Sequence, residues 1–148
     1  MREILFRIKD HDDWYYGYPL NKISKNNIVS FQGKDENGGT YFNALADATT
    51  LTEFTGLTDK NGNMIFEGDI VQVPSNLQGT EFYIGAIEFG NFDDYNGNTY
   101  TGFYIKWHNV PEYSTLRQSI IWWRDEQDRF LKVIGNIHDN PELLNVKE

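Results

Sequence analysis

Apolar and polar residues alternate along most of this chain, and a period of two predicts β-strands rather than helices. In Glu3–Lys9, the residues Ile4, Phe6 and Ile8 fall on one face, with charged residues and one leucine on the other. The same alternation runs through Thr101–Trp107. Each of these segments is therefore expected to form a half-buried strand.

Turn residues separate the apolar runs at short intervals. Gly33–Gly39 has the length and composition of a hairpin loop, and Asp59–Gly62 predicts a tight turn because Asn and Gly tolerate positive φ. Pro74 has no N–H to donate, so the strand before it is expected to end there. The remaining expected strands are Ile28–Gln32, Thr40–Ala44, Leu51–Phe54, Asn63–Phe66, Ile70–Val73, Glu81–Phe89, Ser119–Trp123 and Phe130–Ile134.

Helix signals are confined to two places. Near the end of the chain, Asn140 at N-cap and Pro141 at N1 predict a short C-terminal helix over 139–148, whose leucines pack back on the β body. The second place is Ser114–Arg124. A short helix there is the alternative to the strand expected at Ser119–Trp123. The run of two isoleucines and two tryptophans in Ile120–Trp123 favours the strand.

Length and composition point to a folded domain. The chain has 148 residues, near the modal domain size, and 16% of them are aromatic. Aromatic rings bury large areas with few residues, so a core can form although the chain is polar overall. There is no cysteine, which excludes disulfides, thiolate nucleophiles and Cys-type zinc sites and fits a reducing compartment. No apolar run approaches a membrane span and the start does not resemble a signal peptide, so we expect a cytoplasmic protein.

The formal charge of −9 is unevenly distributed. Residues 1–34 hold six Lys and Arg against four Asp and Glu, whereas residues 35–148 hold seven against eighteen. Nucleic-acid affinity depends mainly on cationic contacts to phosphate. The acidic remainder therefore argues against a broad nucleic-acid-binding face and leaves only a local basic patch near the N-terminus.

Signatures of catalysis and of metal binding are absent from the sequence. None of the motifs GxSxG, HExxH, GxxxxGK[ST] or GxGxxG occurs. Asp59, Asn61 and Asn63 have the first spacings of an EF-hand loop, but Met64 stands where that loop needs glycine. Gly68 and Asp69 before an apolar strand are typical of a corner in a small β-barrel. We expect no catalytic residue, no metal and no cofactor.

Several sequence blocks resemble the YopX family, whose members are found mostly in phages and prophages of Gram-positive bacteria. The blocks are TGLTDKNGNMIFEGDIVQV at Thr55–Val73, IGAIEFGNF at Ile84–Phe92, GFYIKW at Gly102–Trp107, VIGNIHDNPELL at Val133–Leu144 and the opening REILFR. The resemblance implies a mostly β fold, with an SH3-like β-barrel or roll, additional N-terminal strands and an accessory role in the phage cycle. It does not by itself imply a reaction.

These observations together predict one compact unit in three parts. Residues 1–50 are expected to form an N-terminal β extension packed on the barrel, 51–138 the SH3-like barrel, and 139–148 the C-terminal helix and tail. The chain is also expected to associate with copies of itself, since surplus aromatics and Gly-rich edges suit such an interface, although the charge of −9 opposes it.

The predicted function is that of a non-enzymatic protein-binding module of a phage or prophage, acting in the cytoplasm of the host bacterium on an unidentified protein. Phe92, Tyr95 and Tyr100, in a polar and aromatic loop over 91–100, are the expected contact residues, because SH3-type folds bind ligands on aromatic surfaces. The alternative is a nucleic-acid-associated regulator; its cations are Arg2, Arg7, Lys9, Lys22 and Lys25. A hydrolase with paired carboxylates is the second alternative.

Overall fold

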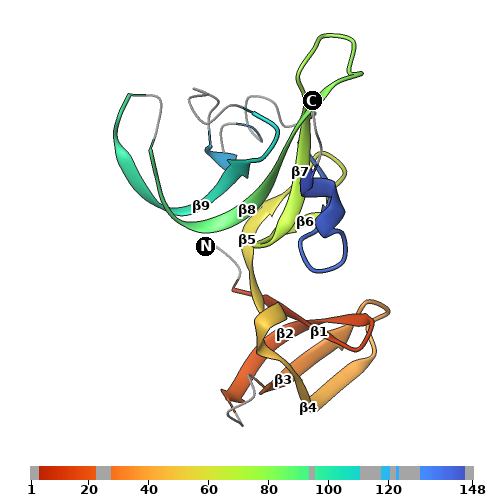
Figure 1. Ribbon diagram of the computed structural model, residues 1–148. Coiled ribbons are helices and arrows are strands. Elements are labelled where there is room, and N and C mark those ends of the chain that lie inside the picture. Colours follow the sequence, from red (N-terminus) through yellow and green to blue (C-terminus); the bar gives the residue numbers. More distant parts are fainter. Residues whose placement is uncertain are drawn as a thin grey trace. The chain divides into compact units, whose positions relative to one another are not determined.

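The computed structural model describes residues 4–22, 28–93, 96–110, 118–120, 123 and 131–145. The chain divides into two compact units, Met1–Gly56 and Leu57–Glu148. Most described residues are in strands, and the strands form two antiparallel sheets (Figure 1). Among the described residues, no helix is long and apolar enough to span a bilayer.

The first sheet has the strand order β4-β3-β2-β1-β5-β6. Its members are β1 Phe6–Asp10, β2 Asp13–Lys22, β3 Ile28–Asp35, β4 Thr40–Asp47, β5 Thr52–Thr58 and β6 Met64–Phe66. A short 3-10 helix, η1 at Ala48–Thr50, joins β4 to β5. The predicted hairpin around the Gly-rich segment is confirmed, and its strands run further into that segment than expected because Asp35 N–H and Gly39 C=O still pair at 2.8 Å.

Two glycines allow β2 and β3 to approach each other closely. Gly17 lies directly opposite Gly33 in the strand register. A Cβ placed on Gly17 would overlap the Gln32 carbonyl group, and one placed on Gly33 would overlap the Tyr16 carbonyl group. Glycine within a strand commonly marks such an approach of two backbones.

The second sheet has the order β10-β7-β8-β9. Its members are β7 Asp69–Pro74, β8 Phe82–Asp93, β9 Thr99–Trp107 and β10 Lys132–Asn136. β7 ends at Pro74, as the missing N–H predicts. Within the described residues both sheets are open, so the SH3-like barrel expected over 51–138 is not confirmed. Period-two patterning predicts strands and their faces but does not decide which edges close on each other.

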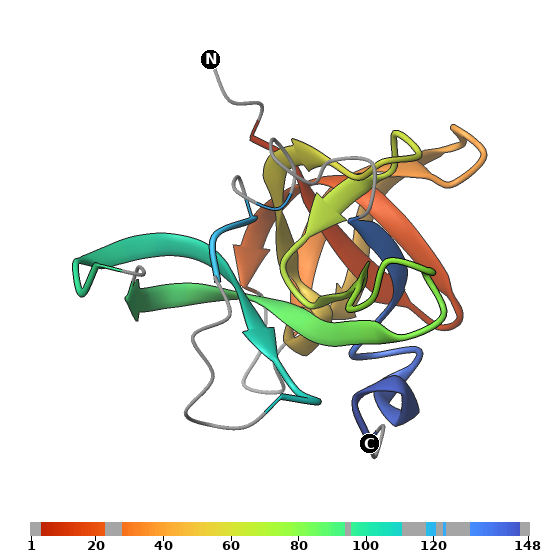
Figure 2. The ribbon, with the colours of Figure 1, turned by 90° about the horizontal axis from the view of Figure 1, so that it is seen from above.

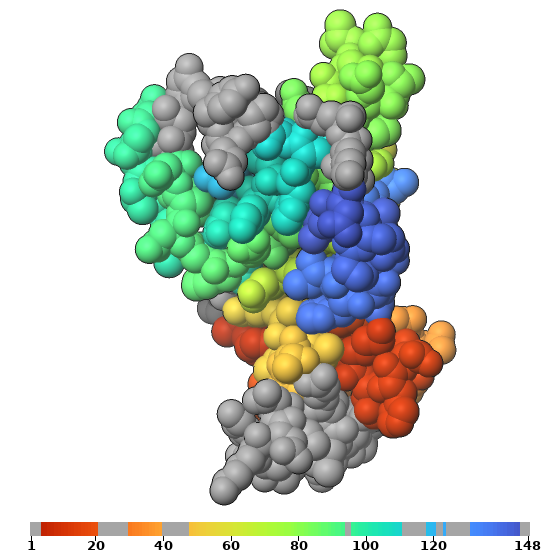
Figure 3. Space-filling model, viewed as in Figure 1, coloured from red at the N-terminus to blue at the C-terminus, as the bar shows by residue number. Residues whose placement is uncertain are grey.

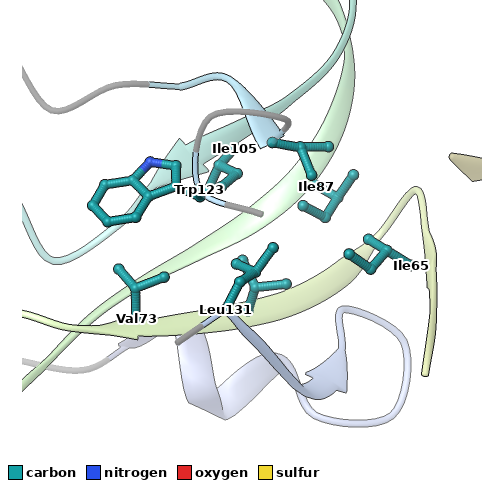
Figure 4. Packing of buried hydrophobic residues seen from close by; sticks show 8 residues of the cluster. Ile65, Val73, Ile87, Ile105, Trp123 and Leu131 are labelled. Carbon is teal, nitrogen blue, oxygen red and sulfur yellow. The ribbon is translucent and has the colours of Figure 1, made fainter. Parts of the chain in front are cut away.

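Each unit has its own apolar cluster. In the first unit, Ile8 and Phe31 are fully buried and partly buried neighbours surround them. In the second unit, side chains from several strands converge on one core (Figure 4). Its buried members are Ile65, Val71, Val73, Ile87, Ile105, Ile120, Trp123 and Leu131.

The prediction of a strand at Ser119–Trp123 is wrong at two described positions. Ile120 and Trp123 have helical backbone, and the Trp123 N–H donates to the Ser119 carbonyl oxygen at 3.4 Å. Ser119 itself makes a single antiparallel bridge to Tyr104. Trp123 is buried in the core of the second unit, whereas Trp122 lies outside the described residues. Burial of Trp123 in that core outweighs the β propensity of its side chain.

The predicted C-terminal helix is not confirmed, because Pro141–Asn145 forms a 3-10 helix, η2, of five residues. Asn140 does not cap it in the expected manner; its Oδ1 accepts from the Asn136 N–H at 3.2 Å, which points back toward β10. Gly135 makes room for this contact, since a Cβ there would come within 2.5 Å of Asn140 Oδ1. A helix this short gains too little from its own hydrogen bonds to settle as an α-helix.

Candidate functional site: an aromatic hairpin surface

The hairpin of β8 and β9 carries the candidate site. The two strands pair in one continuous register from Gly85 opposite Trp107 to Asp93 opposite Thr99. Figures 1 and 2 show them as a long curved ribbon that extends away from the other strands of the second unit. Described residues at the ends of the two strands are exposed, among them Asp93, Thr99 and Tyr100.

The expected loop over 91–100 is mostly strand, which corrects the sequence interpretation. β8 continues to Asp93 and β9 begins at Thr99. Thr99 Oγ1 donates to Asp93 Oδ1 at 2.8 Å, and Thr101 Oγ1 donates to Asn91 Oδ1 at 2.6 Å. These cross-strand pairs extend the ladder through residues that favour turns when taken alone.

Three rings form what we call the aromatic hairpin surface: Phe92, Tyr100 and Tyr104. The Phe92 and Tyr100 ring centroids are 5.9 Å apart, and the Phe92 and Tyr104 rings are stacked at 5.5 Å. Tyr100 is 49% exposed. Of the three residues predicted from the sequence, the structure thus brings Phe92 and Tyr100 together, and Tyr95 lies outside the described residues.

Tyr104 was not among the predicted contact residues. The alternation in Thr101–Trp107 does place Tyr104 on the face of the strand that points away from the core-facing Ile105. Tyr100 lies on the same face as Tyr104, four positions earlier. Two glycines face each other beneath this surface, Gly90 and Gly102. A Cβ on Gly90 would lie 3.7 Å from the Tyr104 ring, so the ring covers a strand position that has no side chain of its own.

The carboxylate of Glu88 borders the aromatic hairpin surface. The Tyr104 hydroxyl donates to Glu88 Oε1 at 3.4 Å. Burial, the charge of Glu88 and this hydrogen bond raise the pKa of Tyr104 above its ordinary value of 10.0. The hydroxyl therefore stays protonated at neutral pH, and the surface offers rings and a hydrogen-bond donor rather than a reactive phenolate.

The opposite face of the hairpin also exposes a ring. Phe89 is 56% exposed and packs edge-to-face on Phe103 at 5.1 Å between ring centroids. Phe103 packs in turn against the core of the second unit. This face continues the core outward, whereas among the described residues none of the rings of the aromatic hairpin surface packs against that core.

The calcium-like spacing at Asp59 has a structural explanation. Asp59 is buried, and its carboxylate accepts hydrogen bonds from the backbone N–H groups of Asn61, Asn63 and Val133, each at 2.9 Å. Gly62 has φ 81°, as the predicted turn requires. The carboxylate oxygens thus hold the turn together, and among the described residues no group of three or more His, Asp or Glu side chains could hold a metal ion.

Gly68 and Asp69 make the expected corner. Gly68 has φ 86°, and the fully buried Asp69 accepts the Phe66 N–H at 2.8 Å. The Gly68 N–H donates to the Ile87 carbonyl oxygen, and its own carbonyl oxygen accepts the Ile137 N–H, both at 2.8 Å. The structural role predicted for this pair is confirmed.

The cations of the nucleic-acid alternative do not form an exposed patch in the described residues. Arg7 is 7% exposed, its guanidinium lies 4.7 Å from the centre of the Trp14 ring, and its Nε donates to Thr52 Oγ1 at 3.3 Å. Lys9 is half-buried. Arg2 and Lys25 lie outside the described residues, and of Lys22 only the backbone is described.

The features above define an all-β protein of two units with an aromatic hairpin. The family model described as "YopX protein" matches residues 5–145, nearly the whole chain. The chain belongs to the YopX family. It is also similar to a solved structure, the crystal structure of protein EF1440 from Enterococcus faecalis, with 26% sequence identity, 97% of this chain and 99% of that chain covered, and a TM-score of 0.52. No curated protein matches the chain.

Proposed function

We propose that this protein is a non-enzymatic protein-binding module and that the aromatic hairpin surface is its contact site. The observation that carries the proposal is the cluster of Phe92, Tyr100 and Tyr104 on one face of an extended hairpin, with Tyr100 about half exposed. Tyrosine and other aromatic residues are enriched at the energetic centres of protein interfaces.

The contacts within and beside the cluster support this function. Stacking between the Phe92 and Tyr104 rings and the cross-strand hydrogen bonds of Thr99 and Thr101 favour the observed arrangement of the surface. A preformed surface loses less conformational entropy when it binds, and more of the contact energy then remains as affinity. The family membership supports a role as an accessory protein of a phage or prophage, in the cytoplasm of the host bacterium.

Charge indicates the kind of partner. Residues 57–148 hold seven Lys and Arg against fourteen Asp and Glu. An acidic unit around an aromatic contact site favours a partner whose own site is apolar at the centre and basic or neutral at the rim.

The proposal predicts the loss of a partner when the two described rings are removed. A tagged full-length chain is expressed in the bacterial host, purified by affinity, and the co-purifying proteins are identified by mass spectrometry. We expect Phe92→Ala with Tyr100→Ala to lose at least one partner that the wild type retains, because truncation of a central ring typically costs about 2 kcal/mol or more of binding energy. Thermal unfolding of the purified variant tests whether its fold is intact.

Tyr18→Ala is the matched control, since Tyr18 is a tyrosine of the first unit that is 52% exposed. This variant should retain every partner. Retention of all partners by the Phe92 and Tyr100 double variant would show that this face is not the contact site. Recovery of nucleic acid alone would favour the regulator alternative.

A further inference from the structure

A second feature of the second unit has a different chemistry from the aromatic hairpin surface. A groove of about 730 Å³ lies beside the loop that joins β7 to β8. Among the residues that line it are Lys60, Gln72, Pro74, Gln78, Phe82 and Lys132. We call it the lysine groove. Its volume lies within the range of sites that hold small ligands or a few residues of a peptide.

Three strands and one turn bring the lining residues together. Lys132 of β10 lies directly opposite Gln72 of β7, and Pro74 of β7 lies opposite Phe82 of β8. The Lys60 N–H donates to the Leu131 carbonyl oxygen at 3.0 Å, which places the turn between β5 and β6 beside the start of β10. The two lysines therefore line one groove although 72 positions separate them in the sequence.

The lysine groove is cationic within an acidic unit. Among the described residues, none of those that line the groove is Asp or Glu. Among the residues of the second unit that the structure describes, the Lys and Arg side chains are Lys60, Lys106 and Lys132, and two of these three lie at the groove. The unit as a whole carries seven more acidic than basic residues. Two ammonium groups that line the same groove create a local attraction for anions.

The loop that forms one wall of the groove is held in a fixed shape. Asn76 Oδ1 accepts from the Thr80 N–H at 3.0 Å and from the Glu81 N–H at 3.3 Å, and Asn76 Nδ2 donates to Thr80 Oγ1 at 2.8 Å. The Ser75 N–H donates to the Glu81 carbonyl oxygen at 2.8 Å. Figure 3 shows this loop, in light green, projecting from the second unit. The wall is thus formed before any ligand arrives, which favours binding.

The other lining groups indicate which anion fits. Pro74 and Phe82 supply apolar surface, and the fully exposed Leu77 stands on the same loop. Gln72 and Gln78 offer amide groups that can donate to and accept from a peptide backbone. A simple inorganic anion would leave the apolar surface of Pro74 and Phe82 unused, and a nucleic-acid strand would extend beyond the groove onto an acidic unit.

We propose that the lysine groove binds a short acidic peptide segment of a partner protein, with carboxylates at Lys60 and Lys132 and an apolar side chain over Pro74 and Phe82. This is a binding site separate from the aromatic hairpin surface. Its test therefore does not depend on the function proposed above.

The test uses the full-length chain and a defined probe, a fluorescein-labelled decapeptide in which Glu alternates with Leu and Phe. Fluorescence anisotropy measures the affinity, and ¹⁵N NMR titration locates the site. We expect saturable binding with shifts at Gln72, at the 75–79 loop and at Phe82. Lys60→Ala and Lys132→Ala should each weaken binding about fivefold, Lys60→Glu with Lys132→Glu should weaken it on the order of 30-fold or more, and added salt should weaken it as well.

Two controls keep the proposal falsifiable. Lys106→Ala removes the third described cation of this unit and should leave the affinity unchanged. The same decapeptide with Gln in place of Glu should bind at least fivefold more weakly, because it lacks the charges. Equal affinity of the charge-reversed variant and the wild type would overturn the proposal. So would shifts confined to the aromatic hairpin surface, or tighter binding of inorganic phosphate or of single-stranded DNA than of the acidic peptide at the same residues.

Discussion

Replacing Asp59 with alanine is expected to lower the free energy of unfolding by about 2–4 kcal/mol. The carboxylate accepts three backbone N–H groups and the Asn63 side-chain amide, whose Nδ2 lies 3.3 Å from Oδ2. The bond from Val133 joins the turn between β5 and β6 to β10, which lies 74 positions further along the chain. Alanine would leave these donors without their acceptor in a place where water has little access.

Asp59→Asn is the matched control for this prediction. Its Oδ1 can still accept the N–H groups of Asn61 and Asn63, whereas Nδ2 replaces the oxygen that accepts the Val133 N–H. We expect about half the loss seen with alanine. Urea unfolding followed by circular dichroism measures both variants. An alanine variant as stable as the wild type would contradict this account of the turn.

The Asp59 carboxylate is also expected to make the free energy of unfolding depend on pH. Burial alone would raise the pKa of Asp59, but the hydrogen bonds from Val133, Asn63 and Asn61 outweigh it and hold the pKa below the ordinary value of 3.8. The charged form is therefore stabilised in the folded state. Its contribution is complete above the unfolded-state pKa, about pH 4, and is lost as the pH falls through the lower folded-state pKa. The stability difference between the wild type and Asp59→Asn should be constant near neutral pH and shrink below about pH 4.

Trp123→Ala is expected to be the most damaging change in the core of the second unit, with a loss of about 3–5 kcal/mol. Trp123 is 8% exposed and packs edge-to-face on Trp107 at 5.5 Å between ring centroids. Trp107 contacts Tyr83 in the same manner at 6.1 Å. Removing the indole opens a cavity and also removes the support of its aromatic neighbours.

Trp123→Phe separates the two contributions to this loss. It keeps a ring against Trp107 and should cost less than half as much as alanine, on the order of 1–2 kcal/mol. Thermal unfolding monitored by near-UV circular dichroism, which reports on the packed aromatics, measures both variants. An alanine variant that unfolds at the wild-type temperature would show that Trp123 does not belong to the core.

Local signals in the sequence predicted the parts of the fold that local chemistry determines. The turn at Asp59–Gly62 needs a residue that tolerates positive φ, and Gly62 supplies it. Pro74 ends its strand because it lacks an N–H. Both features depend on residues within a few positions of each other, which the sequence displays directly.

Features that depend on tertiary packing or on a competing hydrogen bond were not predicted correctly. The helical backbone at Ile120 and Trp123 follows from burial of the tryptophan among residues contributed by several strands, which β propensity does not include. Asn140 has the sequence of a helix cap, but Asn136 and the space above Gly135 direct its side chain elsewhere. The closure of strands into a barrel likewise depends on edge pairing between segments far apart in the chain.

The candidate site was predicted in composition but not in shape. The sequence predicts Phe92 and Tyr100 as rings of a loop, whereas cross-strand pairing places them directly opposite each other on two strands. Tyr104 joined them only once the register of β8 and β9 was known. The lysine groove had no sequence signal, because its two lysines come from distant segments.

Site-specific photo-crosslinking tests the central claim, that the aromatic hairpin surface contacts a partner protein, most directly. The full-length chain carries p-benzoylphenylalanine in place of Tyr100, or in place of Tyr18 as the control, and is irradiated in the bacterial host. The account predicts a crosslinked band of defined size from position 100, absent from position 18, in which mass spectrometry identifies a protein different from this chain. Identical patterns from both positions, or crosslinks from position 100 to a second copy of this chain alone, would contradict it.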